Sequence, residues 1–350
     1  MSMKKRILVA PLNWGLGHAT RCIPIINALL KHDFWPVIAS DGAALTLLKK
    51  EFPELECLEL PGYNISYSKK AKNLKLKLLK DSPRFIKTIK AENKKVKQLI
   101  NLYNISGVIS DNRFGVYFEN LPSVIITHQL QVLSGNTTWF STAIHNKFIR
   151  KFNECWVPDI ENKPSLSGKL GHVKTPVIET KYIGHISRFK KKESSIKYDL
   201  LVLLSGPEPQ RTLLEKRLLK TLKVYNGSLL FVRGLIEDRI SKEKIESIEI
   251  VNYLTSKELE KAINKSNLIL CRSGYTTIMD LAKLEKKAFF IPTPGQFEQE
   301  YLAKRLKSLK IAPYCKQEDF TLEKLNEIED YNGLTNFDHK IDYKKLFSLF

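Results

Sequence analysis

The sequence predicts an α/β protein built from two doubly wound domains. Each half opens with a short buried strand, ILVA at residues 7–10 and DLLVLL at residues 199–204. After each strand, a loop that contains glycine leads into apolar residues at helical spacing. Strands and helices then continue to alternate in both halves, which is typical of parallel sheets with helices on both faces.

In the first half, we expect strands where short apolar runs occur without helical spacing, as in buried parallel sheets. Helices are expected where apolar residues recur every three or four positions, between Cys22 and Leu30 and over Ala43–Lys50. The expected strands are Lys5–Pro11, Trp35–Ala39, Gly107–Ser110, Ser123–Thr127 and Trp156–Pro158.

The second half repeats this order after Tyr198. Leu213, Leu214, Leu218 and Leu222 indicate its first helix. The expected strands are Asp199–Leu204, Ser228–Val232, Ile248–Val251, Leu268–Cys271 and Ala288–Ile291. The polar segment RFKKKESS, residues 188–195, marks the boundary between the halves. The predicted domains are therefore 1–185 and 198–315, followed by a C-terminal tail, 316–350, that could pack back on the first domain.

Composition excludes several classes of protein. Of the 350 residues, 43% are hydrophobic and 27% are charged, which excludes a generally disordered chain. No apolar run approaches roughly 18 residues, so a polytopic membrane protein is excluded as well. The five cysteines are scattered and never form C-x-x-C, which argues against a disulfide framework or a zinc knuckle. The apolar run after MSMKKR is too short for a secretory signal, so we expect a cytoplasmic protein.

The chain is strongly basic, with 57 Lys and Arg against 37 Asp and Glu and a net charge of +20. Such an excess favours an anionic partner. Residues 66–98 concentrate the basic residues in a helix-prone stretch, which is either a solvated helical face or a surface for anionic lipid or a phosphorylated acceptor. No nucleic-acid recognition motif accompanies the charge, so we do not expect a nucleic-acid partner.

The first candidate site follows the first strand, in the loop that holds Gly15 and Gly17. Ligands of doubly wound sheets bind at the carboxyl ends of the strands, and glycines allow a backbone to approach a ligand. The loop lacks the third glycine of a dinucleotide fingerprint, because Thr20 occupies that position. His18 lies at a helix N-terminus, where the dipole disfavours imidazolium, so it could act as a base or merely cap the helix.

Two further residues are expected at the same edge of this sheet. Asp111 ends a predicted strand, and it could orient the imidazole of His18 or cap the next helix. His128 follows the next strand and could line an acceptor pocket or serve a structural role.

The strongest candidate site lies in the second half. Arg272-Ser273-Gly274-Tyr275-Thr276-Thr277 joins a strand to a helix, and free N–H groups at a helix N-terminus suit a phosphate. Asp280 lies about two turns further on, where a carboxylate could accept hydrogen bonds from ribose. A polar loop with Gln296, Gln299 and Glu300 follows the next strand and could bind sugar hydroxyls.

These motifs resemble glycosyltransferase family 28. CRSGYTTIMDLA followed by IPTPGQFEQEYLA is similar to the nucleotide-sugar half of that family, and GLGHATR is similar to its N-terminal glycine-rich loop. The best-known member transfers N-acetylglucosamine from a UDP-sugar to a lipid-linked acceptor. The resemblance runs from about residue 4 to about residue 312 and is sparse between the motifs. It implies the GT-B fold, in which two Rossmann-like domains face each other across a cleft.

The resemblance also implies roles for individual residues. The loop of residues 205–212, with Gly206 and Arg211, would face the donor diphosphate. Tyr253 and Leu254 would contact the base. The residues implied to border the donor phosphates and sugar are Arg272, Ser273, Gly274, Thr276, Thr277, Asp280, Gln296, Gln299 and Glu300. The sequence departs from the family's pattern at three of these places: Glu208 is added, Asp280 replaces Glu, and Glu300 stands where Gln is common.

The interpretation is an inverting, metal-independent glycosyltransferase that needs no cofactor beyond its co-substrate. It would move a hexose or N-acetylhexosamine from a UDP-sugar, with UDP-N-acetylglucosamine as the candidate, to a glycan or lipid-linked acceptor of the cell envelope. His18 would be the base, oriented by Asp111. Peripheral attachment to the inner face of the membrane is a further option. An epimerase or hydrolase acting on UDP-sugars and a non-catalytic basic surface-binding protein remain as alternatives.

Overall fold

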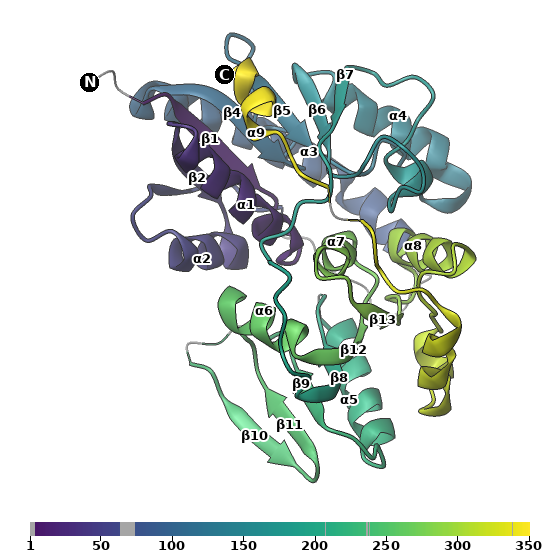
Figure 1. Ribbon diagram of the computed structural model, residues 1–350. Coiled ribbons are helices and arrows are strands. Elements are labelled where there is room, and N and C mark those ends of the chain that lie inside the picture. The colour runs from purple at the N-terminus through teal and green to yellow at the C-terminus, as the bar shows by residue number, and fades with distance from the viewer. Residues whose placement is uncertain (1–3, 64–73, 207, 236, 238, 338) are drawn as a thin grey trace. The chain divides into compact units, whose positions relative to one another are not determined.

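A computed structural model describes residues 4–63, 74–206, 208–235, 237, 239–337 and 339–350, with the backbone alone over 74–82. The chain divides into two compact units (Figure 1). Among the described residues, unit 1 includes 4–63, 75–186 and 339–350, and unit 2 includes those from 187 to 337. The division after residue 186 lies between the two predicted domains.

Unit 1 is built around a seven-stranded sheet in the order β3-β2-β1-β4-β5-β6-β7. Every neighbouring pair in it is parallel. The strands are β1 (Arg6–Pro11), β2 (Trp35–Ser40), β3 (Cys57–Glu59), β4 (Ile105–Asp111), β5 (Ser123–Ile126), β6 (Glu154–Val157) and β7 (Glu179–Tyr182). The helices are α1 (Gly17–Lys31), α2 (Gly42–Glu51), α3 (Leu74–Tyr103), α4 (Thr138–Ile149) and α9 (Tyr343–Leu346).

Unit 2 is built around a six-stranded sheet in the order β10-β11-β9-β8-β12-β13. Its pairs are parallel except for the hairpin of β10 and β11. The strands are β8 (Tyr198–Leu203), β9 (Leu229–Val232), β10 (Lys242–Ile245), β11 (Ile248–Val251), β12 (Ser266–Cys271) and β13 (Lys287–Phe290). The helices are α5 (Gln210–Leu222), α6 (Ser256–Asn264), α7 (Tyr275–Lys283) and α8 (Phe297–Ser308).

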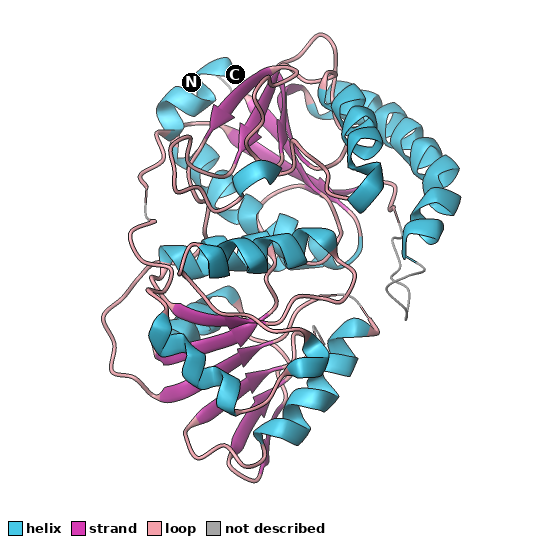
Figure 2. Cartoon of the chain, turned by 90° about the vertical axis from the view of Figure 1, so that its right-hand side faces the viewer, coloured by secondary structure: helices cyan, strands magenta, loops and turns pink. Residues whose placement is uncertain are grey.

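Both units therefore have the doubly wound architecture that the alternating pattern predicts, with helices on both faces of each sheet (Figure 2). Residues 7–10 of β1 are fully buried, as expected of a central parallel strand. Residues of α1 such as Ile25, Ile26 and Leu29 pack on one face of the unit 1 sheet. Val96, Leu99 and Ile100 of α3 pack with Leu8 and Val108 in a separate cluster.

The end of the chain is divided between the two units. Residues 316–337 stay in unit 2, and only residues 339–350 join unit 1. There Phe347 and Phe350 are buried in the core that contains α1. A Cβ at Gly107 would lie 2.4 Å from Cδ1 of Phe350, so the ring occupies the space that this glycine leaves on β4.

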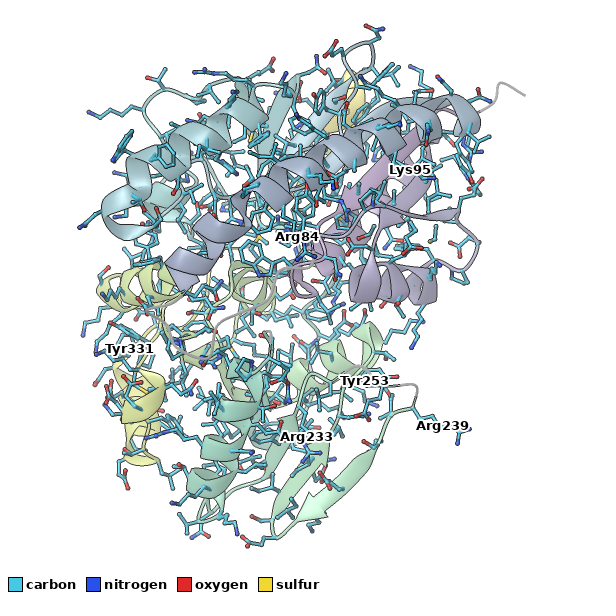
Figure 3. All side chains as sticks on the ribbon, turned by 180° about the vertical axis from the view of Figure 1, so that it is seen from behind. Arg84, Lys95, Arg233, Arg239, Tyr253 and Tyr331 are labelled. Atoms are coloured by element: carbon cyan, nitrogen blue, oxygen red, sulfur yellow. The ribbon has the colours of Figure 1, made fainter. Side chains whose placement is uncertain are left out.

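The basic stretch 66–98 forms part of α3 from Leu74 onward, and residues 66–73 lie outside the described residues. Over 83–98, the exposed cations include Arg84 and Lys95, which Figure 3 labels on this helix. Glu92 is fully buried, because it turns inward to Arg113. Among the described helices, none has the length and apolar character needed to cross a membrane.

Candidate functional site

The carboxyl ends of β1 and β4 bring His18 and Asp111 together. The two strands are neighbours in the sheet, and Pro11 is paired with Asp111. The chain leaves β1, turns at Gly15 with a φ of 70°, and begins α1 at Gly17. This turn places Nδ1 of His18 at 2.8 Å from Oδ1 of Asp111. This contact was expected from the positions of the two residues at the carboxyl ends of strands in one sheet. A catalytic role for the pair stays a prediction.

Sequence reasoning missed a third member of this cluster, Arg21. Its Nε and Nη2 donate to the two carboxylate oxygens of Asp111, and its Nη1 lies 3.3 Å from Nδ1 of His128. Arg21 is 1% exposed and Asp111 is fully buried. The only sequence signal was the position of Arg21 three residues after His18, which puts both side chains on one face of α1.

Burial and these contacts set the charge states of the cluster. Burial alone would raise the pKa of Asp111, but Arg21 and His18 outweigh it and lower that pKa to about 2. The pKa of His18 is lowered from its usual value, chiefly because burial disfavours imidazolium. Asp111 is therefore a carboxylate that can only accept hydrogen bonds, and the His18 tautomer with its hydrogen on Nδ1 donates to it and keeps the lone pair on Nε2.

A second buried arginine, Arg113, also lies near the carboxyl ends of the strands in the unit 1 sheet. Arg113 donates from Nε to Glu92 at 2.5 Å and from Nη1 to Asp41 at 2.7 Å. Its Nη2 donates to the carbonyl of Pro61 at 2.7 Å. These contacts tie the loops that follow β2, β3 and β4 to α3. Arg113 was not predicted, and it has the contacts of a structural residue.

In unit 2, the loop after β8 depends on a glycine that sequence reasoning missed. Gly234 follows β9 with a φ of 72°, and a Cβ there would lie 2.3 Å from the carbonyl oxygen of Leu204. No larger residue fits so close to a backbone oxygen. Gly206 has a φ of 106°, and a Cβ at that position would have no neighbouring atom within 4 Å, so the loop is open on that side. The loop therefore runs tightly beside the end of β9, and Gly206 is accessible.

The predicted phosphate residue Arg211 is held by carboxylates. Its Nε donates to Glu208 at 2.6 Å, and its Nη1 donates to Glu215. Glu208 also accepts from the backbone N–H of Thr212 at 3.3 Å near the start of α5. Glu208, an unexpected neighbour for a diphosphate, is thus paired within the loop.

Arg272, which was expected to border the donor phosphates, is buried within unit 2. It is 1% exposed, and it donates to the carbonyls of Ile291, Pro292 and Gln210 and to the side chain of Gln317, at 2.8–3.1 Å. Burial lowers its pKa to about 10. No carboxylate accepts from it among the described residues. Arg272 therefore connects the ends of β12 and β13 to the start of α5 as a buried cation.

The residues around α7 and α8 are already hydrogen-bonded to each other. Ser273 donates to the carbonyl of Gln299 at 2.8 Å, and the side chain of Gln299 accepts from the N–H of Thr293 at 2.8 Å. Glu300 accepts from the N–H of Gly295 at 2.9 Å. Gly274 and Gln296 occupy the N-cap positions of α7 and α8, each without a side-chain cap. Thr276 and Thr277 lie in the first turn of α7, where the helix N-terminus suits a phosphate.

Asp280 is 9% exposed and accepts a hydrogen bond from Ser187 at 2.6 Å. Burial raises its pKa to about 6, against the lowering effect of Arg188. Ser187 is the first residue of unit 2 after the division of the chain. The residue implied to bind ribose therefore bonds to the chain segment where the units divide.

Tyr253 and Leu254 follow β11, and both are partly buried. The preceding residue, Asn252, accepts from the N–H of Ser241 at 2.8 Å and donates to the carbonyl of Arg239 at 2.8 Å. The loop before β10 is thereby fastened next to Tyr253, and Figure 3 labels Tyr253, Arg233 and Arg239 in this part of unit 2. The predicted donor residues thus follow the carboxyl ends of β8, β11, β12 and β13, four strands of the unit 2 sheet that run in the same direction.

No three His, Cys, Asp or Glu side chains are placed to hold a metal ion together in the part of the chain that the structure describes.

Known proteins resemble this chain at the level of sequence and of fold. Residues 231–331 match the family model described as "Glycosyltransferase family 28 C-terminal domain". The UDP-N-acetylglucosamine--N-acetylmuramyl-(pentapeptide) pyrophosphoryl-undecaprenol N-acetylglucosamine transferase of Clostridium tetani is 26% identical over 300 residues, which cover 83% of this chain and 78% of that protein. The enzyme of the same name from Glaesserella parasuis is 22% identical, over 92% of this chain and 88% of that protein. The match to the Haemophilus ducreyi enzyme spans 57% of that protein's length.

Solved structures agree on the fold. Acinetobacter baumannii MurG superposes with a TM-score of 0.55 at 16% identity, over 93% of this chain and 90% of that one. The spinosyn rhamnosyltransferase SpnG gives a TM-score of 0.61 at 14% identity, over 93% and 91% of the two chains. The chain therefore has the GT-B fold, resembles MurG along most of its length, and matches a family 28 C-terminal domain in unit 2.

Proposed function

We propose that the protein transfers a hexose or N-acetylhexosamine from a UDP-sugar to a hydroxyl of a glycan or lipid-linked acceptor, with inversion at the anomeric carbon. The observation that carries the proposal is the contact of His18 with Asp111 at the edge of a sheet, in a chain whose other unit matches a family 28 domain. UDP-N-acetylglucosamine is the proposed donor, because the relatives from Clostridium tetani and Glaesserella parasuis are named for it.

The proposed reaction needs one proton transfer and one displacement. Nε2 of His18 takes the proton of the acceptor hydroxyl while the hydroxyl oxygen forms a bond to the anomeric carbon. The bond from that carbon to the phosphate oxygen breaks, and UDP leaves with the electron pair. Asp111 orients the imidazole and stabilises the imidazolium that forms, as carboxylates do for catalytic histidines.

The leaving group gains negative charge, and unit 2 offers two groups to stabilise it. The N-terminus of α7 carries partial positive charge, in the place where Gly274 provides no side-chain cap. Arg272 adds a buried cation with no carboxylate partner among the described residues. Because a helix dipole and a cation stabilise the same charge that a metal would, we propose that transfer is independent of metal.

The exposed cations of α3 support a proposed place of action. Residues 84–97 of this helix expose Arg84, Lys87, Lys90, Lys94, Lys95 and Lys97. Polybasic helices are attracted to anionic lipids by about 1 kcal/mol per cation near the surface. We propose that this face rests on an anionic membrane that holds the lipid-linked acceptor.

Calorimetric titration with UDP, ADP, GDP and thymidine diphosphate tests the donor. The thymidine nucleotide is included because SpnG has been solved in complex with thymidine diphosphate. Selective binding of UDP is expected, and selective binding of another nucleotide would replace UDP in the proposal. Binding of none of the four would contradict a nucleotide-sugar donor. Acceptor-dependent release of UDP then separates a transferase from a hydrolase or an epimerase.

A further inference from the structure

Arg21 contacts His18, Asp111 and His128, and nothing in the proposed reaction uses it. It lies one helical turn after His18 on α1, and its guanidinium is fully enclosed. It holds both oxygens of Asp111 in a bidentate contact. Its Nη2 also lies 2.9 Å from Nδ1 of His18. One planar cation therefore touches the proposed base and the carboxylate that orients it.

We propose that Arg21 is a positioning residue that neutralises Asp111 and fixes its orientation, so that the imidazole of His18 stays unprotonated and ready to accept a proton. This inference rests on the proposed function, because it assigns a purpose to the same site. Arg21 does not touch substrate in it. It acts through Asp111 and His18.

The physical reason is the strength of a buried ion pair. A carboxylate within hydrogen-bond distance of an imidazole stabilises the imidazolium, and such neighbours move a pKa by about 1–3 units. Asp111 at 2.8 Å raises the pKa of His18 against the lowering effect of burial, and so reduces the fraction of imidazole that is free to accept a proton near neutral pH. A guanidinium that shares the carboxylate opposes this effect, because its own charge repels imidazolium.

Apart from Asp111, the other groups that face His18 either lower its pKa as Arg21 does or carry no charge. His128 lowers the pKa of His18, as Arg21 does, whereas Asp111 is the group that raises it. Cys22, the next residue on α1, lies with its Sγ 3.7 Å from Asp111, and burial raises its pKa so that it stays a thiol. The N-terminus of α1 adds partial positive charge. Arg21 is therefore the one full cation among the described groups that these contacts place against Asp111.

The geometry is specific to arginine. The fork of the guanidinium spans both oxygens of Asp111, and a lysine would provide a single point of contact. Arg113 offers a matched control in the same unit. It is equally buried and also binds carboxylates, but its partners are Glu92, Asp41 and backbone carbonyls rather than His18.

The test compares Arg21→Met and Arg21→Lys with Arg113→Met in the full-length protein. The first measurement is the rate of UDP release with saturating acceptor from about pH 5.5 to about pH 9.5. For Arg21→Met, the acidic limb of the profile should move up by about one pH unit or more. Activity should then fall about tenfold near pH 6 and recover toward that of the unmodified protein near pH 9, because one pH unit is a tenfold change in neutral imidazole. Arg21→Lys should shift the limb less.

Arg113→Met should lower the melting temperature without moving the limb. An unchanged limb in Arg21→Met, or an equal shift in Arg113→Met, would overturn the proposal. The second measurement is an NMR titration of the His18 ring, assigned by its loss in His18→Gln. This titration needs no turnover, so the role of Arg21 is tested even if the protein transfers no sugar. Absence of transfer would count against the proposed function, and an unshifted His18 titration in Arg21→Met would count against Arg21.

Discussion

Replacement of Asp280 by asparagine should stabilise the protein and weaken nucleotide binding at the same time. Asp280 is 9% exposed, and its carboxylate accepts a hydrogen bond from Ser187 at 2.6 Å. Asparagine keeps an oxygen that can accept this bond and removes the buried charge. Stability should rise while nucleotide affinity falls, so a purely structural role of Asp280 can be distinguished from a role in ligand binding.

The stability change follows from the pKa. Burial raises the pKa of Asp280 from 3.8 to about 6. Because the folded protein holds the proton more tightly than the unfolded chain, stability falls as the pH rises from about 4 to about 6 and stays reduced above that range. About two units at 1.36 kcal/mol each give about 3 kcal/mol at pH 7. Asp280→Asn should recover about this free energy at pH 7, and the gain should vanish near pH 4.

The binding change follows from the charge. A hydrogen bond to a charged group contributes about 1.5–3 kcal/mol, or about 10- to 150-fold in affinity. If Asp280 accepts from the ribose, Asp280→Asn should weaken UDP binding by that factor at pH 7. The same change should barely affect binding of 2′,3′-dideoxy-UDP, which lacks the hydroxyls. Ser187→Ala is the matched control, because it removes the intramolecular donor and leaves the carboxylate available to a nucleotide.

Urea unfolding of the variant at pH 4 and pH 7, together with calorimetry of both nucleotides, provides the measurements. The reasoning is refuted if Asp280→Asn loses stability at pH 7. It is also refuted if UDP and its dideoxy analogue lose affinity equally, because the carboxylate would then act on the protein fold rather than on ribose.

Three further predictions concern Asp111, Gly234 and the independence of the reaction from metal. Asp111→Asn should lower the free energy of unfolding by about 3–5 kcal/mol, because it removes the carboxylate that both Nε and Nη2 of the buried Arg21 contact. In the unmodified protein, the stabilisation by Asp111 should be lost as the pH falls from about 4 through about 2, since its pKa is lowered to about 2 in the folded state. Acid unfolding of the unmodified protein and of Asp111→Asn tests this pH dependence. Coincident unfolding curves would contradict the prediction. Gly234→Ala should displace the loop after β8, because the new Cβ would meet the carbonyl of Leu204 at 2.3 Å. UDP affinity should therefore drop at least tenfold with a lower melting temperature, whereas Gly227→Ala, in a turn before β9, should spare UDP binding. Treatment with EDTA should leave the rate of UDP release unchanged, and restoration by Mg²⁺ of a rate lost to EDTA would disprove metal independence.

Local apolar runs were sufficient to predict the central strands. ILVA and DLLVLL are continuous and buried, and they form β1 and β8 as expected. The strands that escaped prediction are short or exposed. β10 has the sequence KEKI with every residue exposed, so its strand character comes from pairing with β11 rather than from an apolar pattern. β3 is three residues long.

The contact of His18 with Asp111 could be predicted because it follows from topology. Asp111 ends β4 and His18 follows the end of β1, and the register of these adjacent parallel strands brings the two side chains together. Arg21 and Gly234 could not be found in this way. Two partners of Arg21, Asp111 and His128, lie 90 and 107 residues away in sequence, and the need for glycine at 234 arises from the backbone oxygen of Leu204. Such contacts depend on three-dimensional packing that no local pattern records.

The same reason explains the end of the chain. The segment YKKLFSLF has only weak helical spacing, so the sequence left open whether it packs on the first domain. The ring of Phe350 fits into the space that Gly107 leaves on β4, and its centroid lies 6.1 Å from the ring centroid of Trp156. The pocket for these rings is formed by strands that are distant in sequence.

The most direct test of the central claim is acceptor-dependent release of UDP from UDP-N-acetylglucosamine by the unmodified protein and by His18→Gln. The account predicts release that requires a lipid-linked or glycan acceptor. It also predicts a kcat at least about 100-fold lower in the variant, in line with the loss of a general base, with unchanged affinity for UDP. Equal turnover by the two proteins would contradict the role of His18, and release of UDP that ignores the acceptor would contradict a transferase.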